Sequence, residues 1–446
     1  MTTYHHTFGR KGIHPPENKH TAGMPITALP LPRRVELSLS QSLGRPARAI
    51  VKAGDHVCRF DLVGEATGPV SANLHTPISG TVKSVGRIET ADGHGADGIV
   101  IEADDIDHAA DLQAMCDESP LRSGHALDSL TPDEIIDIVH RAGIVGLGGA
   151  TFPTATKLTP PPGSPQCEFL LINAAECEPY LTCDDAIMRA MAEEIATGIE
   201  LLLKALGSNV HCLVGIEENK PQAIKALEQA CRPRKKIRII PLRTRYPQGA
   251  EKMLTKALTG REIASGALPI SQGVIIQNVA TALAVYHAVV WGKPLVERVM
   301  TIYNPGERLH GNVIVPIGTP LKSLLPESSL EGKQKIINGG PMMGRAIAGI
   351  QGATTKGMSG LLLLTLEEAP VADSTPCVRC GRCVEVCPIG LEPYLLARLS
   401  ELGRKEELEQ RHVLDCMECG CCSYSCIARR RLVDWIRTGK ALARRK

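Results

Sequence analysis

The chain has 446 residues with 50 basic and 48 acidic side chains, so its formal net charge is only +2. A charge this small argues against nucleic acid or a membrane surface as the main partner of the whole molecule. A hydrophobic content of 43% excludes a disordered chain, and an aromatic content of 3% argues against base stacking as the main function. At roughly 150 residues per domain, the length predicts about three domains.

The 16 cysteines are unevenly distributed, and nine of them lie between Cys377 and Cys426. A disulfide scaffold is typical of short secreted chains, whereas this N-terminus shows no apolar signal segment. No run of the sequence approaches the roughly 18 apolar residues that span a bilayer. We therefore expect a reducing cytoplasm, where clustered cysteines bind metal.

The first two segments differ in composition. Residues 1–35 are rich in proline and polar groups, which predicts an irregular arm that docks on a partner or on the chain's own β module. Residues 36–125 contain short β runs separated by glycine, and they resemble the barrel-sandwich fold of lipoyl and biotinyl domains. The tip that would carry a modified lysine runs from Gly68 to Asn73 and contains no lysine. The module is therefore expected to be structural.

Residues 130–300 alternate short apolar runs with segments of helical periodicity, which predicts an α/β domain with a mostly parallel sheet. Thr131 and Glu134 have the spacing of a capping box, and Pro132 lies at the first helical position. The spacing therefore predicts that the first helix of this domain begins there.

Three segments follow the α/β domain. Residues 301–365 return to short strands with glycine turns, which predicts a β-grasp-like module. Residues 370–430 carry the clustered cysteines on helices and turns, and residues 431–446 form a basic tail. Such a tail is either a solvated face or a docking element for anionic lipid or a membrane partner.

Two cysteine runs carry the strongest signal in the sequence. Each has three cysteines separated by two residues and a fourth after three more, as in bacterial ferredoxins. The first three wrap one face of a [4Fe–4S] cluster, whereas the fourth points toward the other cluster. The spacing predicts two cross-ligated clusters, held by Cys377, Cys380, Cys383 and Cys426 and by Cys416, Cys419, Cys422 and Cys387.

Structural zinc sites are the alternative, because CxxC pairs also build them. Two complete four-cysteine runs favour iron–sulfur chemistry. Cys421 lies between ligands of the second run, and we interpret it as a free thiol.

A glycine-rich loop from Gly143 to Pro153 follows the first helix of the α/β domain. It is not a dinucleotide-binding fingerprint, because it follows a helix and its sixth position is Thr151. Its glycines still allow backbone N–H groups to approach a phosphate, and Lys157 lies shortly after the loop. The alternative is a tight structural turn.

Four acidic residues lie between Glu176 and Asp185, directly after the apolar run FLLINAA. Ligands of α/β domains bind at the carboxyl ends of parallel strands, where acids can accept hydrogen bonds from ribose hydroxyls. A solvated, capped loop before the next helix is the alternative. Cys177 and Cys183 lack metal-ligand spacing, and we interpret them as buried packing thiols.

Several stretches resemble known families. GLGGATFPTATKL is similar to the FMN-binding loop GRGGAGFPTGLKW in the flavoprotein subunit of respiratory complex I, NAAECEPY to its NADEGEPG loop, and QNVAT to its NNVETL stretch. FGRKGIHPPENK, HTPISGTV, YPQGAEKML and GGPMMG add to these stretches, and the match runs from about Phe8 to about Asp434. Over this length the chain resembles the family of C subunits of Rnf ferredoxin:NAD⁺ oxidoreductase complexes (the RnfC family).

The resemblance implies a site for FMN and NAD(H) in the α/β domain. Carried over by position, the residues that would hold FMN or lie beside it are Gly146, Gly148, Lys157, Asn173, Asn278, Thr281, Gly249 and Glu251. Phe152 would stack on the nicotinamide nucleotide, and Glu176 and Glu178 would contact it. The arginine and the sixth-position glycine of the family's loop are Leu147 and Thr151 here.

We expect hydride exchange between NAD(H) and non-covalently bound FMN, and single-electron transfer through the two clusters. No catalytic proton-transfer residue is predicted, because this chemistry requires none. The resemblance implies an oxidoreductase subunit of an ion-translocating complex, attached peripherally to the cytoplasmic face of the bacterial inner membrane. Its partners would be the integral membrane and ferredoxin-reactive subunits of that complex. The alternatives are a soluble flavin/iron–sulfur NADH reductase of the cobalamin-reductase type and a non-enzymatic zinc scaffold.

Overall fold

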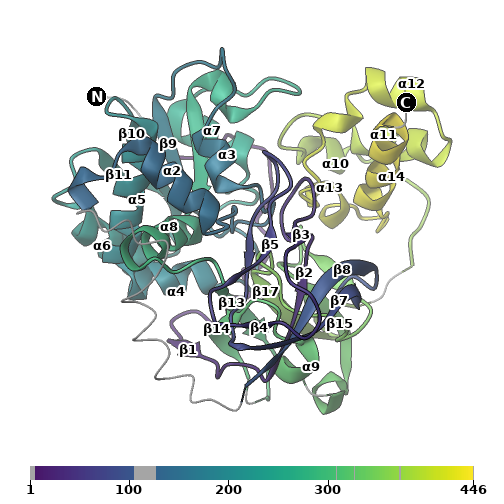
Figure 1. Ribbon diagram of the computed structural model, residues 1–446. Coiled ribbons are helices and arrows are strands. Elements are labelled where there is room, and N and C mark those ends of the chain that lie inside the picture. The colour runs from purple at the N-terminus through teal and green to yellow at the C-terminus, as the bar shows by residue number, and fades with distance from the viewer. Residues whose placement is uncertain (1–5, 105–126, 308, 326, 371–372, 445–446) are drawn as a thin grey trace.

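Figure 1 shows the computed structural model of the chain, which describes residues 6–104, 127–307, 309–325, 327–370 and 373–444. Within these residues the strands form four sheets, and a group of helices follows them toward the C-terminal end. No described helix combines the length and the apolar character needed to cross a membrane.

The first module consists of two small antiparallel sheets. The four-stranded sheet has the order β2-β8-β7-β4, with bounds Arg34–Ser38, Gly95–Ala103, Gly80–Glu89 and His56–Val57. The three-stranded sheet has the order β3-β5-β6, with bounds Arg48–Ala49, Leu62–Glu65 and Leu74–His75. Val35 and Leu37 of β2 are both buried, because alternate side chains of a strand point to the same face. They share one core with Val63 and Leu74 of the smaller sheet, as a barrel-sandwich module requires.

The α/β domain is built on a four-stranded parallel sheet. Its order is β11-β10-β9-β12, with bounds Ile237–Leu242, His211–Glu217, Phe169–Ala174 and Val274–Asn278. The helices that share the core on one face are α2 (Pro132–Arg141), α3 (Thr154–Leu158), α4 (Cys183–Ala190), α5 (Ala192–Leu206), α6 (Pro221–Cys231) and α8 (Val279–Trp291). Helix α7 (Glu251–Thr259) covers the opposite face, where Leu254 and Leu258 pack with Leu171 and Leu213. Both faces are therefore buried, as is typical of parallel sheets.

The start of α2 confirms the predicted capping box. The backbone N–H of Glu134 donates to Thr131 Oγ1 at 3.3 Å, and the backbone N–H of Thr131 donates to Glu134 Oε2 at 2.7 Å. These two bonds satisfy donors that the first turn of a helix otherwise leaves free. Short 3₁₀ turns, η1 (Leu127–Ser129) and η2 (Pro269–Gln272), precede α2 and β12.

The six-stranded sheet joins residues from distant parts of the chain. Its order is β1-β14-β13-β17-β15-β16, with bounds Ile26–Ala28, Gly311–Pro316, Glu297–Tyr303, Gly360–Thr365, Lys333–Asn338 and Arg345–Ile347. Strand β1 comes from the predicted arm and pairs in parallel with β14, so this strand of the arm docks on the β-grasp-like module rather than on the barrel-sandwich module. Strand β13 begins ahead of the predicted border at residue 301. Helix α9 (Leu321–Leu324) and the 3₁₀ turn η3 (Glu327–Leu330) connect β14 to β15.

The C-terminal helical region contains two similar helix pairs. Its elements are α10 (Arg382–Glu385), α11 (Pro393–Glu401), α12 (Lys405–Gln410), η4 (Val413–Asp415), α13 (Cys421–Tyr424) and α14 (Leu432–Arg444). The prediction of a separate basic tail over residues 431–446 is wrong, because α14 packs on α11. Leu432, Val433 and Ile436 are buried in this contact, and such apolar spacing forms one face of a helix.

Candidate functional site

The predicted flavin residues meet at the carboxyl edge of the parallel sheet, where β9 and β12 end. The glycine loop packs against the start of α8 there, and the backbone N–H of Leu147 donates to Thr281 Oγ1 at 3.0 Å. A Cβ atom at Gly148 would lie 3.3 Å from the Asn278 side chain, so this close approach favours glycine. We call this region, with Gly146, Gly148, Asn173, Gly249, Asn278 and Thr281, the flavin edge.

Backbone contacts set the shape of the glycine loop. The N–H of Gly146 donates to Phe152 O at 2.8 Å, which closes the loop on itself. Gly149 and Thr151 have φ angles of +120° and +52°, so the loop keeps a left-handed turn at Thr151, where the family's loop has its sixth-position glycine. The Leu147 side chain, in place of the family's arginine, is buried. The stretch from Gly148 to Ala150 is exposed and is therefore the part that a phosphate can approach.

Two further pairs join predicted residues across this edge. Asn173 Nδ2 donates to Gly249 O at 2.8 Å, and Lys157 Nζ forms an ion pair with Glu251 Oε1 at 2.8 Å. Lys157 Nζ also donates to the backbone oxygen of Ile276 in β12 at 3.2 Å. Asn173 at the end of β9, Lys157 on α3, and Gly249 and Glu251 at the start of α7 are therefore joined in two pairs at this edge.

Buried polar atoms without partners mark the same edge. Gln277 is 2% exposed, yet neither amide atom has a hydrogen-bond partner in the described part of the chain. Gln248 is fully buried, and its Nε2 also has none there. Unsatisfied buried amides are costly, and a ligand that offers both donors and acceptors removes the cost. The edge therefore fits a polar heterocycle such as FMN. Both glutamines lie within motifs of the sequence, Gln248 in YPQGAEKML and Gln277 in QNVAT, but neither was selected from the sequence as a site residue.

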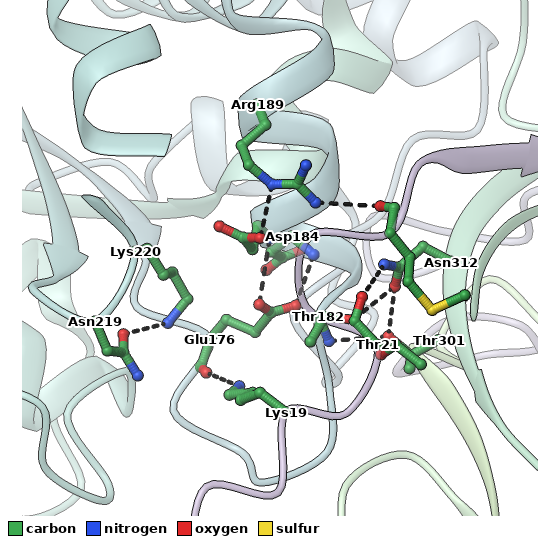
Figure 2. A network of polar contacts seen from close by, with 12 residues as sticks. Lys19, Thr21, Glu176, Thr182, Asp184, Arg189, Asn219, Lys220, Thr301 and Asn312 are labelled. Carbon is green, nitrogen blue, oxygen red and sulfur yellow. Dashed lines mark hydrogen bonds and ion pairs between the residues drawn. The ribbon is translucent and has the colours of Figure 1, made fainter. Parts of the chain in front are cut away.

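The acidic loop is held by its own chain. Glu176 accepts hydrogen bonds from the backbone N–H groups of Asp184 at 2.6 Å and Asp185 at 3.2 Å, so its carboxylate caps α4 (Figure 2). Asn278 Nδ2 donates to Asp184 Oδ2 at 2.8 Å and links the loop to the flavin edge. Burial raises the pKa of Asp184 to about 7, and the nearby charge of Glu176 adds to this rise. The Glu176 carboxylate thus has internal partners in addition to its predicted nucleotide contact.

Lys19 in the arm fixes the backbone of the acidic loop. Its Nζ donates to the backbone oxygens of Glu176 at 2.8 Å, Glu178 at 2.9 Å and Leu181 at 2.6 Å. Figure 2 shows this lysine close to Glu176, with Thr21 from the same arm close to Thr182. The arm is therefore part of the site. Sequence reasoning missed Lys19 because the first of these contacts joins residues 157 positions apart.

Glu178 connects the acidic loop to two other loops. Its carboxylate accepts hydrogen bonds from the backbone N–H groups of Met342 at 3.0 Å and Met343 at 2.9 Å. The Tyr246 hydroxyl is shared between Glu178 Oε1 at 3.3 Å and Cys419 O at 2.8 Å. Burial raises the pKa of Glu178 to about 6. Glu178 therefore joins the acidic loop to segments that contact the helical region. Its place in the motif does not indicate this role.

One group of four cysteines surrounds a cavity in the helical region. Cys387 of the first run lines this cavity with Cys416, Cys419 and Cys422 of the second, and we call them the inner set. Burial raises the pKa of Cys416 to about 11, and the charges of Cys419 and Cys387 add to the rise. The backbone N–H of Leu391 donates to Cys387 Sγ at 3.3 Å. Four thiols around one cavity with apolar walls fit a [4Fe–4S] cluster.

The remaining ligands form the outer set, Cys377, Cys380, Cys383 and Cys426. Cys377 and Cys380 are exposed, whereas Cys383 is buried and packs in one cluster with Cys426. Burial raises the pKa of Cys383, and the charge of Cys426 adds to it. The backbone N–H of Arg430 donates to Cys426 Sγ at 3.4 Å, as Leu391 does at Cys387. Cys422 of the inner set belongs to the same apolar cluster as Cys383 and Cys426, so the assignment of the outer four to one cluster stays a prediction.

Three other cysteines lie close to these sites. Cys183 Sγ donates to Ser359 O at 3.4 Å, and Cys177 Sγ accepts a hydrogen bond from the backbone N–H of Gly249 at 3.4 Å. Cys421 is fully buried and borders the inner cavity. Its interpretation as a free thiol stays a prediction.

Three family models match successive parts of the chain. They are the RnfC barrel sandwich hybrid domain at residues 7–106, the Nuo51 FMN-binding domain at residues 139–287 and the 4Fe-4S dicluster domain at residues 369–427. These matches cover the β module, the α/β domain and the helical region in turn. They agree with the fold class and cofactor types predicted from the sequence.

Two curated relatives match over most of their own length. The chain is 42% identical to the C subunit of the ion-translocating oxidoreductase complex of Rhodobacter capsulatus, over 87% of this chain and 74% of that protein. It is 39% identical to the C subunit of the Na(+)-translocating ferredoxin:NAD(+) oxidoreductase complex of Acetobacterium woodii, over 99% of this chain and 98% of that protein. Its fold is similar to a chain of the NAD+-reducing [NiFe]-hydrogenase in the air-oxidized state. That match has a TM-score of 0.52 and 18% identity over 75% of this chain and 70% of the other.

Proposed function

Because the chain belongs to the family of C subunits of ion-translocating (Rnf) oxidoreductase complexes, we propose that it is the NAD(H)-reactive electron-transfer subunit of such a complex. The observation that carries the proposal is the meeting of two sites within one chain. The Tyr246 hydroxyl bonds to Cys419 O in the inner set, and Cys177, which packs against the same apolar cluster as Tyr246, accepts the backbone N–H of Gly249 at the flavin edge.

The flavin edge supplies what FMN binding needs. The residues that would hold FMN or adjoin it are Gly146, Gly148, Lys157, Asn173, Gly249, Glu251, Asn278 and Thr281. Gln277 joins them because its buried amide lacks a partner in the described chain. Bound FMN would exchange hydride pairs with NAD(H) and single electrons with iron–sulfur clusters. Phe152, Glu176 and Glu178 are the residues proposed to face the nucleotide.

The helical region supplies the one-electron sites. The inner and outer sets would each hold a [4Fe–4S] cluster through four thiolates. The backbone N–H groups of Leu391 and Arg430 donate to the ligands Cys387 and Cys426, and such hydrogen bonds tune cluster potentials. The apolar walls of the inner cavity, among them Leu396, limit the access of water to that cluster.

We place the protein peripherally on the cytoplasmic face of the membrane, beside the integral membrane and ferredoxin-reactive subunits of its complex. The free-standing reductase is less favoured, because Lys19 makes the arm part of the site. Association with membranes in cell extracts, released by salt, separates the two. A protein that stays in the supernatant at low salt supports the free-standing reductase.

The proposal is tested by an absorption spectrum of anaerobically purified protein before and after addition of NADH. Iron, zinc and extracted flavin are quantified on the same sample. We expect about eight irons per chain, one FMN and bleaching by NADH. Zinc without iron overturns the redox function, and full cofactor content without bleaching by NADH overturns the NAD(H) reaction.

A further inference from the structure

Two buried cations of the β-grasp-like module lie behind the glycine loop. Arg298 of β13 is 5% exposed, and its Nη2 donates to the backbone oxygen of Leu147 at 3.4 Å. Lys356 is fully buried, and its Nζ donates to the backbone oxygen of Gly143 at 2.8 Å, where the loop begins. Arg298 Nη1 also donates to the backbone oxygen of Lys356 at 2.5 Å, so the two residues are joined. A module outside the α/β domain therefore places positive charge against the loop.

The peptide that accepts the Arg298 hydrogen bond directs a donor to the opposite side. The C=O and N–H groups of a trans peptide point in opposite directions, so the N–H of Gly148 points away from Arg298. Gly148, Gly149 and Ala150 are exposed, and none of the hydrogen bonds found in the described chain uses their backbone N–H groups. Exposed backbone donors of this kind bind phosphate oxygens. The loop therefore carries a cation on its buried side and donors suited to a phosphate on its open side.

No carboxylate neutralises Arg298 within the described chain, where all hydrogen bonds of its guanidinium go to backbone oxygens. Two acids lie nearby, and each has another partner. Glu297 pairs with Lys293 at 2.5 Å, and Asp184 accepts a hydrogen bond from Asn278 at 2.8 Å. Burial raises the pKa of Asp184 to about 7, so its charge is incomplete at neutral pH. A buried charge without a counter-charge is costly, and an anion bound to the loop offsets that cost.

Both β modules fix the ends of the loop. The backbone N–H of Leu43 in the barrel-sandwich module donates to Thr151 O at 3.1 Å. Lys356 Nζ donates to Asn73 O at 2.7 Å and thereby ties the same module to the start of the loop. Burial lowers the pKa of Lys356 to about 7, whereas a guanidinium keeps its charge throughout the neutral range. Lys356 therefore contributes mainly position, and Arg298 contributes the lasting positive charge.

We propose that Arg298, held behind the glycine loop by the β-grasp-like module, makes the flavin edge select FMN over flavin that lacks the phosphate. The inference rests on the proposed function and deepens it, because it names the residue that favours the phosphate end of the flavin. The phosphate of FMN carries close to two negative charges at neutral pH, whereas riboflavin is uncharged. Arg298 is a positioning residue that acts through its charge and through the peptide between Leu147 and Gly148.

The test compares the binding of FMN and of riboflavin to the flavin-depleted full-length protein. Equilibrium dialysis gives the Kd of each flavin, so the readout does not depend on electron transfer. We expect Arg298→Gln to weaken FMN binding by about tenfold or more and riboflavin binding by less than about twofold. The retained affinity for riboflavin then also shows that the site is folded. Arg298→Lys keeps the charge, and we expect it to keep most of the preference for FMN.

Arg261→Gln is the matched control, because it removes the same charge at the other end of the parallel sheet. Arg261 pairs with Glu168, directly before β9, at 2.7 Å, and we expect both Kd values to be unchanged in this variant. Equal losses of FMN and riboflavin binding in Arg298→Gln overturn the proposal, because the arginine then supports the fold of the site and not the recognition of phosphate. Unchanged Kd values in Arg298→Gln overturn it as well, and so does an equal loss of preference in Arg298→Lys and Arg298→Gln.

The unmodified protein separates this inference from the proposed function. If it binds neither flavin, the FMN site is wrong and the inference fails with it. If it binds FMN and riboflavin equally well, the flavin site stands and selection through the phosphate is wrong. The expected result is a lower Kd for FMN than for riboflavin in the unmodified protein and in Arg261→Gln, and a loss of most of this difference in Arg298→Gln.

Discussion

The two cysteine runs have the same spacing and the same local backbone, but they lie in opposite surroundings. Arg379 and Glu418 occupy equivalent positions with φ angles of +57° and +59°, and a left-handed glycine follows the next cysteine in both runs. Glu418 is held by Arg437 at 2.8 Å and by Lys440 at 2.5 Å, whereas Arg379 is exposed. The ligand spacing therefore sets which cofactor binds, and the residues packed outside the runs set which cluster faces which partner.

The largest effect is expected when the fourth cysteine of either run is replaced. Cys387→Ser is expected to remove the inner cluster and Cys426→Ser the outer one, so each variant retains about four of about eight irons. Iron analysis and the EPR spectrum of the dithionite-reduced protein measure both losses. Cys58→Ser is the control and keeps all iron. Cross-ligation is wrong if Cys426→Ser retains both clusters in full.

The next effect concerns the arm on the flavin side. Lys19→Met removes three hydrogen bonds and leaves buried carbonyl oxygens of the acidic loop unsatisfied. We expect a loss of about 3 kcal/mol in the free energy of unfolding, together with a higher KM for NADH. Chemical unfolding and steady-state dye reduction measure these changes, with Lys52→Met, an exposed lysine, as the control. An unchanged KM would show that the arm does not support the nucleotide site.

Tyr246→Phe tests the contact between the α/β domain and the inner set. The variant loses the hydroxyl bond to Cys419 O, which is worth about 1 kcal/mol of unfolding free energy. We expect flavin bleaching by NADH to be unchanged and cluster bleaching to become slower, as followed by stopped-flow absorption. Tyr303→Phe, which loses a bond to Glu368 in the β-grasp-like module, is the matched control. Equal rates of cluster bleaching in Tyr246→Phe and Tyr303→Phe would show that the Tyr246 hydroxyl does not support electron transfer to the clusters.

The smallest effect is a pH dependence at the acidic loop. The pKa of Asp184 is raised from 3.8 to about 7 by burial and by Glu176. As pH rises between these values, the unfolded chain releases its proton first, so the folded protein loses stability until the pH exceeds about 7. Asp184→Asn removes this titration. The melting temperature of the variant relative to the unmodified protein should therefore increase from pH 5 to pH 7.5, and parallel curves would contradict the shifted pKa.

Local signals predicted much of this molecule. The capping box at Thr131 and Glu134 is confirmed, and so is the fold class with its barrel-sandwich, FMN-binding and dicluster modules. These features depend on residues that are near in sequence or on spacings fixed by a ligand.

Contacts between distant segments could not be predicted from the sequence. Lys19 reaches carbonyl oxygens of the acidic loop, and Glu178 bonds to the loop at Met342, through partners that no local pattern indicates. The high density of charge in residues 431–446 led to the prediction of a tail. The buried apolar face at Val433 and Ile436 instead packs this segment as a helix. A few buried apolar residues outweigh many exposed charges, because exposed charges are solvated in either state.

The most direct test of the account is rapid freeze-quench EPR of the anaerobic holoprotein after mixing with NADH. The Cys387→Ser and Cys426→Ser variants first assign one signal to each cluster. We predict that the inner-set signal rises before the outer-set signal. In Cys387→Ser, the outer-set signal is expected not to rise. An outer signal that appears first, or at an unchanged rate without the inner cluster, would contradict it.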